Sequence, residues 1–205
     1  MAHPSMLSRR HLTGGDALKF QSFLFVRHGR TEHNLRRIVQ GHRDIPLDEV
    51  GRYEAEQAAA AVAALGWVEY VASSDLARAR ATAEALAFGH GLPVALDADL
   101  RERSFGPYEG GPAGPDFWGS RVEGVEDCDD FAERIARALM RHAPGRNTAI
   151  VAHGGVLRVI GWMFDLALPD AAFRNAAPLR FTFRDGAWRV VDVLAETMIA
   201  GRNAA

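Results

Sequence analysis

Hydrophobic and polar positions divide this chain into short apolar runs and longer runs with helical spacing. Four short, mostly apolar runs predict β-strands, at 22–27, 67–73, 93–96 and 147–152. Four longer runs carry apolar residues at helical spacing and predict helices, at 47–65, 75–88, 128–142 and 155–166. Near the end, two alternating runs flank Asp185-Gly186, which predicts a β-hairpin across 179–193.

Strands that alternate with helices predict βαβ units. We therefore expect an α/β protein, a three-layer α/β/α sandwich around a mostly parallel central sheet. In such sheets ligands bind outside the carboxyl ends of the strands. Arg27 and His28 directly follow the first predicted strand, and His153 directly follows the fourth. Both histidines are thus predicted to lie on the same rim of the sheet.

Five side chains of complementary chemistry are predicted to gather at that rim. Arg78 lies in the first turn of the helix after the second strand, and Glu102 lies in the loop after the third. With Arg27, His28 and His153 they would combine two guanidiniums, two imidazoles and a carboxylate. Guanidinium groups bind phosphate oxygens bidentately, and helix N-termini add backbone donors for the same anion. This set favours a phosphate group as the ligand.

Composition and charge narrow the class of protein. The chain has 205 residues, of which 48% are hydrophobic, and this favours a folded domain over disorder. We expect one domain over 20–200, preceded by a flexible tail over 1–19. The formal charge of −2 gives no reason to expect nucleic acid or an anionic membrane as a partner. No apolar run approaches the ~20 residues of a membrane span. The single cysteine excludes an internal disulfide, so we expect a cytoplasmic location.

Five separated segments carry a recognisable set of motifs. They are RHGRTEHN (27–34), VQGHRDIPLDEVG (39–51), SSDLARARATA (73–83), LRERSFGPYEG (100–110) and VAHGGVLR (151–158). Together they resemble the motifs of the histidine phosphatase superfamily, also called phosphoglycerate mutase-like, over residues 22–195. An RHG triplet alone is a weak signal, but five segments in the right order make the resemblance specific.

The resemblance implies chemistry at a phosphate group that needs neither a metal nor a cofactor. His28 would be the nucleophile that becomes a phosphohistidine, with its other ring nitrogen donating to a backbone carbonyl. Arg27 and Arg78 would clamp the phosphoryl oxygens, with His153 as a further donor. Glu102 would protonate the leaving oxygen and then activate water. The other residues implied to bind phosphate or substrate are Asn34, Gln40, Gly41, Arg30 and Gly154.

Some of these assignments have rivals within the sequence. Arg80 lies two residues after Arg78, although the Leu-x-Arg spacing favours Arg78. Glu109 competes with Glu102 for the role of the acid. Asn34 could serve only as a helix cap. Arg30 departs from the family pattern, in which many relatives carry Glu; it would add a positive charge either to the surroundings of the nucleophile or to a substrate contact.

The segment that could cover the site affects which reaction we expect. The segment 104–127 is rich in Gly and Pro and can form only a small cover made of loops. Within it, Phe117 and Trp118 would either anchor the loop or form a wall against the substrate. A small, open cover admits water, which favours a phosphatase acting on a small phosphorylated metabolite. A phosphoglycerate mutase-type transfer and a non-catalytic phosphate-binding protein stay open as alternatives, as does a homodimer.

Overall fold

The sheet of this protein is mixed, with a parallel part and an antiparallel edge. The computed structural model describes residues 22–114 and 117–195. The strands are β1 (Ser22–Arg27), β2 (Tyr70–Ser73), β3 (Val94–Leu96), β4 (Thr148–Ala152), β5 (Pro178–Arg184) and β6 (Ala187–Asp192). They lie in the order β3-β2-β4-β1-β5-β6, and the first four are parallel. β5 runs antiparallel to β1 and forms the predicted hairpin with β6.

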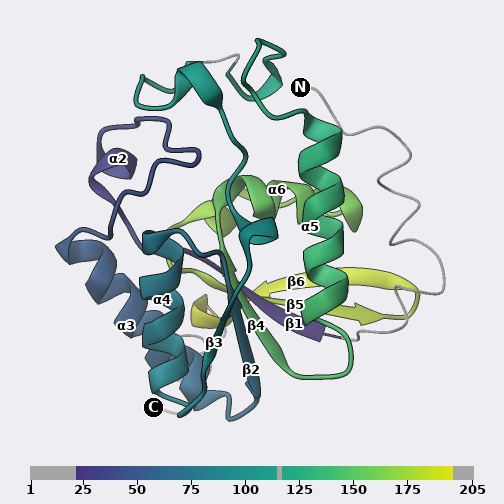
Figure 1. Ribbon diagram of the computed structural model, residues 1–205. Coiled ribbons are helices and arrows are strands. Elements are labelled where there is room, and N and C mark those ends of the chain that lie inside the picture. Colours follow the sequence, from purple (N-terminus) through teal and green to yellow (C-terminus); the bar gives the residue numbers. More distant parts are fainter. Residues whose placement is uncertain (1–21, 115–116, 196–205) are drawn as a thin grey trace.

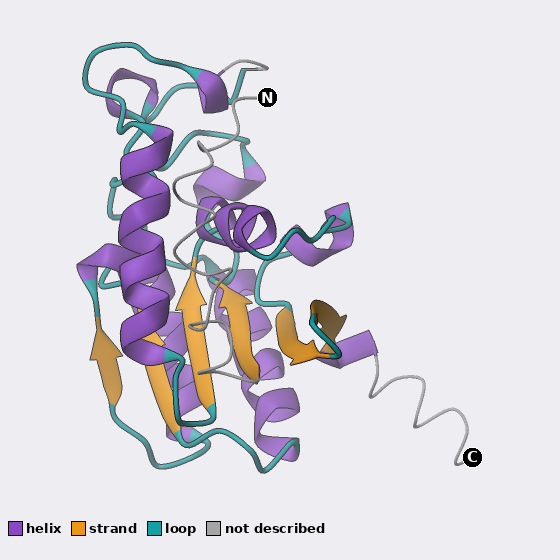
Figure 2. Ribbon diagram, turned by 90° about the vertical axis from the view of Figure 1, so that its right-hand side faces the viewer, coloured by secondary structure: helices purple, strands orange, loops and turns teal. Residues whose placement is uncertain are grey.

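Helices cover both faces of this sheet (Figures 1 and 2). The α-helices are α2 (Glu32–Leu35), α3 (Glu49–Ala64), α4 (Ala77–Phe88), α5 (Cys128–His142) and α6 (Gly154–Met163). The 3-10 turns are η1 (Ala98–Leu100), η2 (Gly106–Tyr108), η3 (Phe117–Gly119) and η4 (Asp170–Phe173). Asp48 caps α3 as the sequence predicts, since its Oδ1 accepts a hydrogen bond of 2.7 Å from the Gly51 backbone.

The alternation of side chains along β1 separates two apolar cores. Phe23 and Phe25 point into one core together with α5 and α6, which contribute residues such as Ile135. Leu24 and Val26 point into the other core, against α3 and α4. Because successive side chains of a strand face opposite sides, a fully apolar strand needs a layer on each face. The predicted three-layer α/β/α fold is confirmed.

Most predicted elements are present, with shifts at their ends. The strand predicted at 67–73 begins at Tyr70, and the helix predicted at 155–166 spans Gly154–Met163. The sequence did not indicate α2 or the four 3-10 turns, which lie in the loops that surround the rim. The predicted flexible tail over 1–19 lies outside the described residues. Among the helices of the described part, none combines the length and the apolar character needed to cross a membrane.

The pairing of β1 with β4 decides where the candidate chemistry gathers. Arg27 at the end of β1 is in register with Ala152 at the end of β4. The backbone of His28 then donates to the Ala152 carbonyl at 2.9 Å. The residue after each strand is therefore a histidine on the same edge, and the rings of His28 and His153 have centroids 5.2 Å apart.

Candidate active site

A cavity of about 910 Å³ opens at the carboxyl ends of the parallel strands. Its walls come from the end of β1, the segment after α2, the first turn of α4, the loop after β3 and the start of α6. Eight of the ten residues predicted for the site line it: Arg27, His28, Asn34, Gln40, Gly41, Arg78, Glu102 and Gly154. His153 lies directly behind His28, and Arg30 lies elsewhere.

The ring of His28 is held in one tautomer. Its Nδ1 lies 2.7 Å from the carbonyl oxygen of Gly29. Because a carbonyl only accepts, Nδ1 carries the hydrogen and Nε2 keeps its lone pair. The side chain is only 3% exposed, and burial, together with the charges of Arg78 and Arg27, holds the pKa of His28 well below its ordinary value. The imidazole is therefore neutral and is able to act as a nucleophile.

Two buried guanidiniums flank this ring. Arg78 is fully buried, and it donates to the carbonyls of Arg43 and Gly41, both at 2.8 Å. Burial lowers the pKa of Arg78 to about 10 and lowers that of Arg27 as well, and both groups remain charged at neutral pH. Arg27 donates to the Phe173 carbonyl. The Nε atoms of both arginines are buried without a hydrogen-bond partner among the described residues.

The rival of Arg78 has a different role. Arg80 is exposed and forms an ion pair of 2.8 Å with Glu84, one turn along α4. The two arginines are two positions apart on a helix, so they point to different faces. The spacing argument made from the sequence therefore selects the arginine that reaches the cavity.

His153 is a buried residue that lies next to His28 at the start of α6. It is fully buried as the N-cap residue of α6, and its Nε2 lies 2.9 Å from the Ser74 hydroxyl at the end of β2. Burial and the nearby charges of Arg78 and Arg27 hold the pKa of His153 well below its ordinary value. Its Nδ1 is buried and has no partner in the described part of the chain. An orphaned buried polar atom is costly, and a phosphate oxygen could provide its partner.

Glu102 faces the start of α6. Its Oε2 accepts from the Gly155 backbone at 3.0 Å, and its Oε1 accepts from the Arg103 backbone at 2.9 Å. A Cβ at Gly155 would lie 2.0 Å from Oε1, so only glycine permits this approach. Glu109 does not line the cavity. Its Oε1 accepts from the backbones of His42 and Phe105 and so braces the loop. The geometry therefore favours Glu102 over Glu109.

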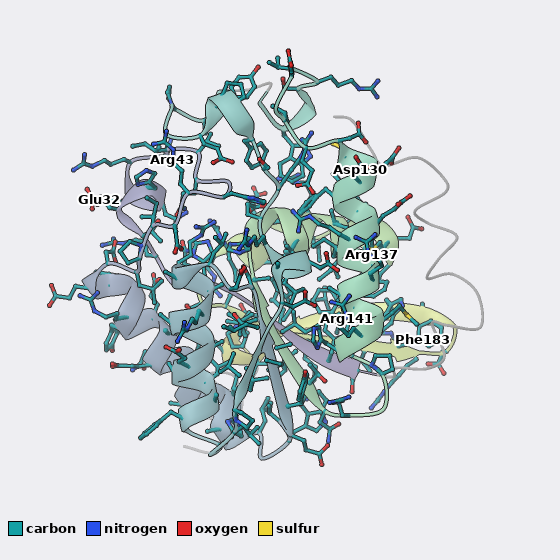
Figure 3. All side chains as sticks on the ribbon, viewed as in Figure 1. Glu32, Arg43, Asp130, Arg137, Arg141 and Phe183 are labelled. Atoms are coloured by element: carbon teal, nitrogen blue, oxygen red, sulfur yellow. The ribbon has the colours of Figure 1, made fainter. Side chains whose placement is uncertain are left out.

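The loop that carries Glu102 is fastened to α5. Arg134 donates to the carbonyls of Asp99, Arg101 and Glu102 at 2.8, 2.7 and 2.8 Å. Arg141, one of the α5 arginines labelled in Figure 3, adds an ion pair of 3.2 Å to Asp99. Hydrogen bonds that involve a charged donor are the stronger ones, so this set fixes the backbone on which the carboxylate stands.

The segment after α2 presents amide groups to the cavity. Thr31 caps α2, and its backbone N–H donates to Asn34 Oδ1 at 3.1 Å. The Gln40 Oε1 accepts from the Thr31 hydroxyl at 3.0 Å. Since both amide oxygens face Thr31, the NH₂ groups of Asn34 and Gln40 are the donors that remain for a ligand. Asn34 is thus both a capping residue and a lining residue.

The structure does not bring Arg30 to the cavity, contrary to its predicted role in substrate binding. Its Nε donates to Asp48 Oδ2 at 2.9 Å, which ties the RHG loop to the N-terminus of α3. The acidic N-cap of α3 is a close charged partner for Arg30, and nothing in the sequence pattern indicated this pairing. Arg103 also turns inward, where it donates to the Glu126 carbonyl at 2.8 Å.

Comparison with known proteins agrees with this geometry. The sequence profile described as the histidine phosphatase superfamily (branch 1) matches residues 23–195. The chain belongs to the histidine phosphatase superfamily. It is 33% identical over 171 residues to phosphoglycerate mutase-like protein 4 of Arabidopsis thaliana, covering 74% of this chain and 73% of that protein. It is 29% identical over 185 residues to the uncharacterized phosphatase PhoE of Bacillus subtilis, covering 86% and 95%.

Other relatives extend the comparison. The chain is 34% identical to an agropine synthesis reductase of Rhizobium rhizogenes over 82% of its own length but spans only 41% of that protein. Among solved structures, a mycobacterial glucosyl-3-phosphoglycerate phosphatase superposes with a TM-score of 0.68 at 26% identity, covering 84% of this chain and 97% of that one. The superfamily thus contains relatives named as phosphatases and relatives named as mutases.

Several residues around the superfamily site were not singled out from the sequence. Ser74 contacts His153, and the Asn175 side chain donates to the His28 carbonyl at 2.9 Å. Arg158 and Trp162 line the cavity. They lie four and eight positions after Gly154, so helical spacing places all three on one face of the predicted helix. This spacing is the sequence signal that could have identified them. Asn175 carries no such signal, because it lies in an irregular segment between η4 and β5.

We expect the two buried histidines to make the protein less stable in acid. The pKa values of His28 and His153 lie well below the value of about 6.5 that an unfolded histidine has, so only the unfolded state gains these protons as the pH falls below that value. Each histidine therefore lowers the free energy of unfolding by at most about 1.4 kcal/mol per pH unit below pH ~6.5.

Urea unfolding between pH 7.5 and 5.5 measures this effect. The variants His28→Asn and His153→Asn should each show a shallower loss of stability than the wild type, and the double variant should show the shallowest. Equal slopes in all four proteins would mean that these histidines accept protons as readily in the folded state as in the unfolded one.

Proposed function

We propose that this protein hydrolyses phosphomonoesters through a phosphohistidine formed on His28. The observation that carries the proposal is the neutral His28 ring, with its Nε2 lone pair available, between the buried guanidiniums of Arg27 and Arg78. A neutral nucleophile beside fixed positive charges suits attack on an anionic phosphoryl group. The carboxylate of Glu102 lines the same cavity.

The first step transfers the phosphoryl group to the enzyme. Nε2 of His28 attacks phosphorus, the bond from phosphorus to the ester oxygen breaks, and Glu102 in its protonated form gives its proton to the leaving alcohol. The ring gains a positive charge as the bond from nitrogen to phosphorus forms. The Gly29 carbonyl, which accepts from Nδ1, stabilises that charge.

The second step releases phosphate. Glu102, now a carboxylate, takes a proton from water as the water oxygen attacks phosphorus and the bond to Nε2 breaks. Arg27, Arg78 and His153 hold the phosphoryl oxygens through both steps, and the N-terminus of α6 adds backbone donors. The two arginines supply the positive charge, so the proposed reaction needs no metal ion.

We choose hydrolysis over transfer because the small cover of loops expected over 104–127 would admit water. Relatives of similar length include the phosphatase PhoE and a mycobacterial phosphatase, and both are covered almost entirely by the match. Mutase-type transfer remains the second candidate, because the relative from Arabidopsis thaliana is named as mutase-like. The substrate that we propose is a phosphorylated metabolite of low molecular weight.

Assays with p-nitrophenyl phosphate between pH 5 and 8, in the presence of EDTA, test this proposal. We expect nitrophenol and free phosphate to form in equal amounts, with a rate that EDTA does not change. Incubation of 3-phosphoglycerate with 2,3-bisphosphoglycerate tests the second candidate. A rearranged phosphoester without free phosphate would show that the reaction is transfer and not hydrolysis. If neither product formed, a binding protein would be favoured.

A further inference from the structure

One face of α6 starts at the proposed phosphate site and runs away from it along the cavity. Gly154, Gly155, Arg158, Gly161 and Trp162 all line the cavity, at the spacing of three and four positions that marks one side of a helix. An α-helix rises ~1.5 Å per residue, so Trp162 lies about 10 Å along the axis from Gly155. The cavity-lining face of α6 is therefore about 10 Å long, and the leaving group of a substrate could lie along it.

Aromatic rings form the wall along this face. Trp118 packs edge-on against Trp162, with ring centroids 6.0 Å apart. The Arg158 guanidinium lies 5.1 Å from the Trp118 ring and 5.4 Å from the Phe173 ring. All four side chains line the cavity, and Leu168 adds apolar surface at the far end.

The near end of this wall adjoins the proposed acid. A Cβ placed on Gly155 would lie 2.0 Å from Glu102 Oε1 and 2.8 Å from the ring edge of Trp118. The carboxylate and the indole edge are therefore neighbours. A leaving oxygen that is protonated by Glu102 must emerge beside Trp118, and the group attached to it then extends towards Trp162.

The size of the cavity also exceeds the needs of a phosphate with a short alcohol. Its volume of about 910 Å³ is in the range of sites that enclose a drug-sized ligand, which is roughly 300–1,000 Å³. Aromatic and aliphatic walls stabilise apolar groups that leave water, and rings pack well against indole.

We propose that the preferred substrates are phosphate esters whose leaving group is an apolar ring system, longer than one phenyl ring, that packs along the α6 face against both Trp118 and Trp162. This inference rests on the proposed function, since it assumes that phosphate binds beside His28. It assigns the length of the leaving group to the α6 face and its apolar character to the two tryptophans.

A graded series of aryl phosphates tests this assignment. Phenyl, 2-naphthyl and 4-biphenylyl phosphate present similar reacting groups with increasing length. For the wild type, kcat/KM should rise roughly tenfold or more from phenyl to 4-biphenylyl phosphate, through the added apolar contact. Trp162→Ala should remove most of that gain, so that the three esters differ little in kcat/KM. Trp162→Leu is a second variant that keeps apolar bulk for folding.

Phe88→Ala is the matched control, because Phe88 is 90% exposed on α4 and does not line the cavity. It should retain the wild-type gradient. Equal kcat/KM along the series, an equal loss on all three esters in both Trp162 variants, or a stronger preference for a disaccharide phosphate of similar length would overturn the inference.

Binding separates this inference from the proposed function. The Kd values of phenylphosphonate and 4-biphenylylphosphonate, which cannot be hydrolysed, can be measured by calorimetry for the wild type and Trp162→Ala. Tighter binding of the longer phosphonate only in the wild type supports the long apolar subsite, even if no ester is turned over. Hydrolysis of phenyl phosphate with no preference among the phosphonates keeps the proposed function and rejects the subsite.

Discussion

His28→Asn is expected to lower kcat/KM for p-nitrophenyl phosphate by more than about 10,000-fold, as losses of covalent nucleophiles do. Asparagine has no lone pair at the position of Nε2 that could attack phosphorus. The two guanidiniums would remain, because Arg78 is held by the carbonyls of Gly41 and Arg43 rather than by His28. The variant should therefore still bind inorganic phosphate or vanadate while it loses turnover.

Acid-labile labelling tests the chemistry of this residue directly. Brief incubation with a ³²P-labelled substrate, followed by a quench in alkali, should leave label on the wild type and none on His28→Asn. His90→Asn is the matched control, since His90 contacts the Leu86 carbonyl at the end of α4 and does not line the cavity. Wild-type turnover in His28→Asn would show that the nucleophile is a different group.

Glu102→Gln is expected to have the second largest effect, with a size that depends on the leaving group. Glutamine has one acceptor oxygen, so it can keep one of the two bonds from the Gly155 and Arg103 backbones, but it cannot donate or take up a proton as a carboxyl group does. Loss of a general acid costs about 10²–10⁴-fold. Alkyl phosphates, whose alkoxides leave poorly, should lose more of their rate of phosphoryl transfer than p-nitrophenyl phosphate, whose anion leaves without a proton.

The second step gives a separate readout for Glu102. Because the same carboxylate would activate water, the phosphoenzyme should persist longer in Glu102→Gln, and nitrophenol should appear in a burst. Glu109→Gln is the matched control, because Glu109 braces the backbone next to the cavity without lining it. A uniform loss on alkyl and aryl phosphates, without a burst, would assign Glu102 a structural role only.

The periodicity of the sequence predicted the fold well because both faces of the sheet are buried. Runs of apolar residues such as 22–27 had to be strands between two layers, and the helical spacing over 128–142 matches α5 residue by residue. The element ends were less well predicted. The 3-10 turns around the rim depend on contacts with distant segments, for example the donation from Arg103 to the Trp118 carbonyl in η3.

The residues that follow strands could be placed at the site from the sequence, whereas the surroundings of loop residues could not. Parallel strands end at one edge, so the sequence placed His28 and His153 on the same rim, and the Leu-x-Arg spacing favoured Arg78 over Arg80. Arg30 shows the limit of this reasoning, because it lies two positions after the nucleophile in sequence while its partner in space is Asp48.

By itself, the sequence determined the α/β fold class, the rim and the chemistry of the side chains at the rim, because these follow from local periodicity and from strand direction. Only the tertiary structure decided which nitrogen of His28 is free, that Arg30 turns to Asp48 instead of the cavity, and how far the α6 wall extends. Those features depend on hydrogen bonds and packing between segments that are distant in sequence, such as Trp118 against Trp162. For each of these side chains the sequence allows several contact partners, and the packing of distant segments leaves one.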